Sequence, residues 1–109
     1  MAETRKVLGQ SNPGAATLTD AYTVPGATQA IVSTISVANR SATPTAFRIS
    51  VAVAGAVDDA KQYAYYDITI GGNVTFVSTL GITLGAADVI RVYATLATLS
   101  FNIFGVELT

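Results

Sequence analysis

Residues 30–54 read AIVSTISVANRSATPTAFRISVAVA, and this stretch predicts two β-strands joined by a polar loop. Successive side chains of a strand point to opposite faces, so each strand is expected to have one apolar face and one small or polar face. The loop at 39–44 contains turn-forming residues and is the expected exposed contact point. The core-facing set is expected to be Ile31, Ile35, Val37, Phe47, Ile49, Val51 and Val53. The opposite face, which could be solvated or could dock a partner, comprises Val32, Thr34, Ser36, Arg48, Ser50 and Ala52.

Further strands are expected from the same alternation of apolar and polar residues, at 17–24, 63–70, 74–80, 89–95 and 98–108. No stretch has the spacing of an amphipathic helix. The sequence therefore predicts an all-β fold, an antiparallel β-sandwich of seven to eight strands, with a jelly-roll-like order favoured over an immunoglobulin-like one. The apolar parity changes at Phe104, next to Gly105, which predicts either a β-bulge or a strand with both faces buried, one of them against another chain.

The domain organisation follows from the chain length of 109 residues, which suits a single domain. Residues 1–14 are expected to form an N-terminal arm with at most one short strand at 5–8, and residues 15–109 the β-sandwich domain. Such an arm would strap neighbouring subunits together in an oligomer and would fray in a monomer.

Composition excludes several classes of function. Charged residues make up 12% of the chain and the net charge is -1, with no basic cluster of the kind that nucleic-acid binding requires. No apolar run reaches the roughly 18 residues of a membrane-spanning helix, and no signal-peptide pattern is seen, so synthesis in a cytoplasm without membrane insertion is expected. The scarcity of charge fits either a solvated, threonine-rich surface or one covered by other subunits.

Catalytic chemistry has few candidate groups, because the chain has no histidine and no cysteine. Asp58 and Asp59 are adjacent, and they are expected to lie in an exposed loop without a calcium-binding pattern. The expectation is a protein that is not an enzyme, with no catalytic residues, no metal site and no cofactor.

Three tyrosines, Tyr63, Tyr65 and Tyr93, share the outward parity of their predicted strands. Aromatic rings on a sheet face can stack on sugar rings, which makes these residues candidate glycan contacts. Cross-strand packing or burial at a subunit interface would explain the same pattern.

Two blocks resemble a family of small all-β virion proteins of tailed bacteriophages. Residues 18–51 read LTDAYTVPGATQAIVSTISVANRSATPTAFRISV, and residues 88–108 read DVIRVYATLATLSFNIFGVEL. The resemblance implies a structural subunit located on the virion exterior in many copies, either a capsid decoration (cement) protein or a subunit associated with the tail or fibre. Its expected partners are itself, as a homo-oligomer and foremost a trimer, and other virion proteins such as the major capsid or tail subunits. The candidate interface residues are Val7, Leu8, Val32, Arg40, Ser41 and Phe104.

A carbohydrate-binding module for attachment to a host-surface glycan is the alternative function. It would use the outward tyrosines.

Overall fold

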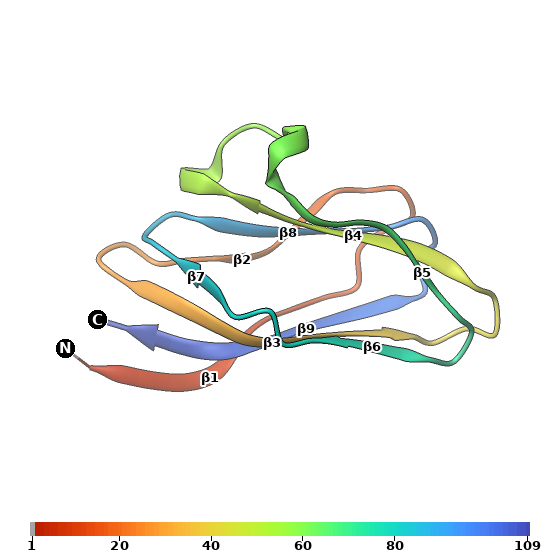
Figure 1. Cartoon of the computed structure of the whole chain (residues 1–109), viewed down its shortest axis with the longest axis horizontal. Coiled ribbons are helices and arrows are strands. Elements are labelled where there is room, and N and C mark those ends of the chain that lie inside the picture. Colours follow the sequence, from red (N-terminus) through yellow and green to blue (C-terminus); the bar gives the residue numbers. More distant parts are fainter. Residues whose placement is uncertain (1) are drawn as a thin grey trace.

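The computed structural model describes residues 2–109 and is built from strands, with two short 3-10 helices (Figure 1). The strands are β1 (Glu3–Ser11), β2 (Thr19–Thr23), β3 (Gln29–Asn39), β4 (Thr45–Ala52), β5 (Tyr63–Ile70), β6 (Thr75–Ser78), β7 (Ile82–Leu84), β8 (Val89–Ala94) and β9 (Leu99–Leu108). The two 3-10 helices, η1 (Val53–Gly55) and η2 (Ala60–Gln62), both lie between β4 and β5.

The strands form two antiparallel sheets that pack face to face. Sheet A has five strands in the order β1-β9-β3-β6, with β7 also paired to β3, and sheet B has four in the order β2-β8-β4-β5. Sheet A is the lower layer in Figure 1 and sheet B the upper one. The predicted all-β, antiparallel sandwich is thus confirmed, although β1 lies within the residues expected to form an arm and β7 lies where no strand was expected. The preference for a jelly-roll-like order stays a prediction.

The core lies between the sheets and is centred on Phe47, whose side chain is fully buried. Its ring lies 5.1 Å from that of Phe76 and 6.1 Å from that of Phe101, measured between centroids, in tilted and edge-on arrangements. Such offset geometries are favourable for aromatic pairs, and they join β4 of sheet B to β6 and β9 of sheet A. Aliphatic side chains of β3, β4, β8 and β9 complete the core, including Ile35, Ile49, Ile90, Val92 and Ile103.

The facing of β3 differs from the prediction at its start. Ile31 was expected in the core but is 40% exposed, whereas Val32 was expected outside and is 2% exposed. The pairing of β3 with β9 shifts register between Val32 and Thr34, so Ser33 is an extra residue. A bulge of one residue reverses which side chains face inward, and a strict alternation from Ile35 backwards could not detect it.

The outer face of β4 also differs from the prediction. Ser50 and Ala52 were expected to be solvated or to dock a partner, but both are buried. The segment 53–62, which contains η1 and η2, folds over this part of sheet B (Figure 1). Arg91 of β8 holds it there by donating hydrogen bonds to the carbonyl oxygens of Gly55 and Ala56, at 3.2 and 2.8 Å. Val53, expected in the core, leaves the strand at this point and is exposed.

β1 is longer than the short strand expected at 5–8, and it pairs with β9 of the same chain from Glu3 to Ser11. It also lies close to β2 of the other sheet. A Cβ atom on Gly9 would lie 2.2 Å from the carbonyl oxygen of Ala21, so only glycine permits this approach. In this structure residues 3–11 are therefore part of sheet A.

Candidate functional site

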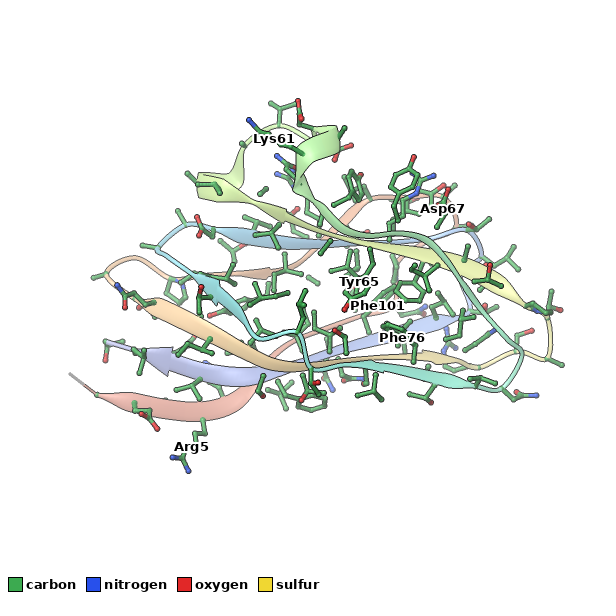
Figure 2. The ribbon with its side chains drawn as sticks, in the orientation of Figure 1. Arg5, Lys61, Tyr65, Asp67, Phe76 and Phe101 are labelled. Atoms are coloured by element: carbon green, nitrogen blue, oxygen red, sulfur yellow. The ribbon has the colours of Figure 1, made fainter. Side chains whose placement is uncertain are left out.

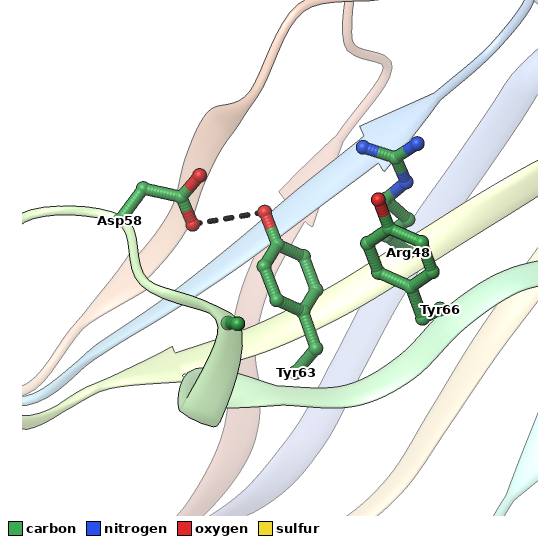
Figure 3. A pocket seen from close by; sticks show the side chains of 5 residues that line it. Arg48, Asp58, Tyr63 and Tyr66 are labelled. Atoms are coloured by element: carbon green, nitrogen blue, oxygen red, sulfur yellow. Dashed lines mark hydrogen bonds between the residues drawn. The ribbon is translucent and has the colours of Figure 1, made fainter.

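An open pocket of about 540 Å³ lies on the outer side of sheet B, beside the segment 53–62 (Figure 3). It is the candidate site because it combines aromatic rings with charged groups. We call it the tyrosine pocket, and it is lined by Arg48, Asp58, Ala60, Tyr63 and Tyr66.

A bulge in the edge strand β5 creates the pocket. Tyr65 pairs with Ile49 and Ile68 pairs with Phe47, which leaves Tyr66 and Asp67 together opposite Arg48. Asp67 has a φ of 52°, in the left-handed region that side chains other than glycine rarely adopt. Because of this bulge, two consecutive side chains reach the outer face next to Arg48, and a regular strand would present only one of them.

Arg48 is the centre of the charged part of the site. Its Nε and Nη2 atoms donate to the Asp67 carboxylate at 2.6 and 3.3 Å. Its guanidinium carbon lies 4.2 Å from the ring centroid of Tyr66 and 4.4 Å from that of Tyr93, within the range of cation–π contacts. The hydrogen bond to Asp67 raises the pKa of Arg48 above its ordinary value, so the guanidinium is charged throughout the accessible pH range.

Tyr63 forms the opposite wall. Its hydroxyl donates to Oδ1 of Asp58 at 2.8 Å, the bond drawn in Figure 3, and its ring meets that of Tyr66 at 5.1 Å and 90°. Partial burial, followed by the bond to Asp58, raises the pKa of Tyr63, which keeps the hydroxyl protonated as a donor. The loop that carries Asp58 is fixed by η2, where Asp59 and Gln62 form a capping box.

The three tyrosines expected to contact a glycan do not lie together. Tyr63 and Tyr93 are on the outer side of sheet B, as their parity indicated. Tyr65 points between the sheets, where its hydroxyl bonds to Oγ of Ser78 and its ring lies 5.5 Å from Phe76 (Figure 2). The outward assignment of Tyr65 was therefore wrong.

Tyr66 and Arg48 take part in the pocket, and the sequence reasoning assigned neither of them to the glycan site. The run Tyr65-Tyr66-Asp67 breaks the apolar–polar alternation of its strand. That break was the only signal of the bulge in the sequence.

A second feature lies on the outer face of sheet A. Four apolar side chains, which we call the sheet A patch, are Val7, Ile31, Phe104 and Val106. Val7 is directly opposite Phe104, and Ile31 is opposite Val106. Val7 is 46% exposed and Phe104 37%.

The patch arises because the predicted bulge at Phe104 lies on the two neighbours of β9 instead. β1 shifts register between Val7 and Gly9, and β3 shifts between Val32 and Thr34, while β9 keeps its alternation. Phe104 and Val106 consequently face outward, and Gly105 faces the core.

The candidate interface residues separate into three groups. Val7 and Phe104 lie side by side in the sheet A patch, whereas Leu8 and Val32 are buried in the core. Placing those two in an interface was therefore wrong, because the bulges turn them inward.

The other two candidates lie in the β3–β4 loop, at the end of the sandwich away from the two chain ends (Figure 1). Arg40 donates to the carbonyl oxygen of Ala97 at 3.1 Å, and the Ser41 backbone N–H donates to Oδ1 of Asn39 at 3.1 Å. The loop is thus held by bonds within the chain, and it is remote from the sheet A patch.

Within residues 2–109, no group of three or more histidine, cysteine, aspartate or glutamate side chains is placed to hold a metal ion. No helix in the same range is long and apolar enough to cross a membrane. Comparison with models of known protein families finds no match, and comparison with curated proteins finds no significant match.

Proposed function

We propose that this protein is a non-enzymatic structural subunit of a bacteriophage virion, which associates with further copies of itself on the particle exterior. The observation that carries the proposal is the sheet A patch, a group of apolar side chains exposed on a chain with few charges. The bacteriophage setting rests on the resemblance of residues 18–51 and 88–108 to small virion proteins. In that setting the subunit would decorate the capsid or form part of the tail or fibre apparatus, beside major capsid or tail subunits.

A second copy of the chain is the partner that fits the patch best. Glu3 and Arg5 precede Val7 along β1 and form an exposed ion pair at 3.2 Å, so both signs of charge lie at the rim of the patch. A symmetric assembly can therefore bring Glu3 of one copy toward Arg5 of the next without placing like charges together. A partner with one dominant sign of charge would gain nothing from such a rim. A trimer is the expected assembly.

The absence of histidine and cysteine from the sequence supports a role without catalysis. In the tyrosine pocket, Arg48 is paired with Asp67, and the Asp58 carboxylate accepts a hydrogen bond from Tyr63. These pairings suit groups that bind and orient better than groups that transfer protons.

Light scattering on the purified protein tests the proposal. The wild type is expected at a multiple of the 11.2 kDa chain mass, and Phe104→Asp, which places a charge in the patch, is expected at a lower mass. Val57→Asp is the matched control, because Val57 is exposed on the segment over sheet B, and it should leave the mass unchanged. A wild type that stays monomeric and does not bind to virions would refute the proposal.

A further inference from the structure

We propose that the tyrosine pocket binds a neutral sugar ring. This site is on sheet B, on the opposite side of the sandwich from the sheet A patch, and the inference does not depend on self-association.

The charges around the pocket favour a neutral ligand. Arg48 would attract an anion, but its charge is already balanced by Asp67 at 2.6 Å, and Asp58 on the facing wall would repel an anion. A cation would seek the face of Tyr66, but the guanidinium of Arg48 already lies over that ring at 4.2 Å. Ligands of either charge therefore meet a like charge in the pocket, and an uncharged ligand does not.

The surfaces that remain open match the two kinds of surface on a sugar. Arg48 covers one face of the Tyr66 ring, but the residue is still 56% exposed, so the uncovered part of the ring provides an apolar surface for the C–H face of a pyranose. Oδ2 of Asp58 and the hydroxyl of Tyr66 form no hydrogen bond with any group of residues 2–109, so both can bond to sugar hydroxyls. A volume of about 540 Å³ accommodates one or two sugar rings.

The backbone of β5 supports a binding role for the same residues. Five other non-glycine residues with positive φ lie in turns or in η1, while Asp67 alone lies within a strand of the described chain. Strained backbone and edge-strand bulges concentrate at sites where a side chain must be aimed. Here the strain places Tyr66 beside Arg48 and aims Asp67 at the guanidinium, which fixes Arg48 against the ring.

The test is an array of immobilised neutral oligosaccharides, with uronate-containing oligosaccharides on the same surface, followed by titration of the best binder in solution. Neutral glycans are expected to bind, and Tyr66→Ala should weaken the binding by about tenfold. Asp58→Asn keeps the shape of the wall but removes its charge, and it should weaken binding by a smaller factor. Val74→Ala, an exposed truncation in the β5–β6 turn, is the control and should bind as the wild type does.

Three results would overturn the proposal. They are an array on which no neutral glycan binds, binding by Tyr66→Ala as strong as that of the wild type, and stronger binding of uronates, or of choline added as a cationic probe, than of the neutral glycans. The Phe104→Asp variant separates this inference from the proposed function. If the sugar site is real, that variant binds the free sugar in solution as the wild type does, whatever its oligomeric state. Circular dichroism of each variant confirms that it is folded.

Discussion

Gly105 of β9 is the position where the structure predicts the greatest sensitivity to a single methyl group. It faces the core at the level where β1 and β3 are both bulged. A Cβ atom placed there would lie 2.1 Å from the carbonyl oxygen of Ile31 and 3.0 Å from Cδ1 of Leu8. Real Cβ atoms essentially never approach another atom within 3.0 Å, so Gly105→Ala must move the backbones of β3 and β9 apart by nearly an ångström.

The cost follows from what has to move. Forcing extra volume into a packed interior destabilises by about 1–3 kcal/mol when neighbouring side chains can adjust. Here the first obstacle is a backbone oxygen, and separating the strands also weakens their ladder, so the loss should be about 3 kcal/mol. For a chain of this size that corresponds to a fall in melting temperature of about 12 °C.

Urea unfolding monitored by circular dichroism measures this loss, and Gly26→Ala is the matched control. A Cβ atom on Gly26, in the turn between β2 and β3, meets nothing within 4 Å, so that variant should unfold within about 1 kcal/mol of the wild type. Gly105→Ala should lower the urea midpoint while the dependence on urea concentration stays the same. Equal midpoints for the two variants would refute the close approach of β3 to β9 and the bulges that cause it.

Three further outcomes follow from buried contacts. Glu107 accepts a 2.7 Å hydrogen bond from Tyr22, and this bond, together with a second one from Lys6, lowers the pKa of Glu107 below the ordinary 4.5. The stability that the ionised carboxylate contributes is therefore present above pH 4.5 and is lost as the pH falls through the pKa of the folded state. Tyr22→Phe should cost about 1–2 kcal/mol at pH 7, and its difference from the wild type should shrink on acidification in unfolding titrations from pH 7 to 3; a constant difference would contradict the linkage. Asn39→Ala removes a buried side chain that donates to two loop carbonyl groups, and it should lower the free energy of unfolding by about 2–3 kcal/mol in urea titrations, whereas Asn39→Asp should recover only the bond that the side chain accepts. Phe47→Ala empties the centre of the core and should cost about 3–5 kcal/mol by calorimetry; a loss below 1 kcal/mol would place that ring outside the core.

The layered fold could be predicted from sequence because alternation of side chains is a property of each strand alone. Phe47 and Ile49 were correctly assigned to the core on this basis. The prediction from alternation was wrong where an extra residue enters a strand. The face on which Ile31 lies is set by the pairing of β3 with β9, and the residues around Ile31 do not indicate it. It also could not show that residues 53–62 fold over sheet B, because that arrangement joins segments whose placement depends on the whole fold.

The tyrosine pocket illustrates the same limit at a site. Tyr63 and Tyr93 were assigned to the outer face by parity alone, and correctly. The prediction placed Tyr65 among the outward rings, whereas the structure places Tyr66 there. The Tyr65 ring packs beside Phe76 in the core, and the Tyr66 ring is exposed beside Arg48. The pattern of residues could indicate that aromatic rings gather here, and only the register could say which of them a ligand would meet.

The position of β9 between β1 and β3 has a consequence for how the chain reaches this fold. β1 is paired with β9 from Glu3 opposite Leu108 onward, so the first strand of sheet A is synthesised long before the strand that completes it. β3 also cannot form its longest ladder of hydrogen bonds until β9 has been synthesised. Contacts between residues so far apart in sequence require closure of large loops, and chains dominated by them fold in milliseconds to seconds. Until β9 has been synthesised, the unpaired edges of β1 and β3 can pair with strands of neighbouring chains. Aggregation is therefore most favoured at that stage, when many copies are synthesised close together.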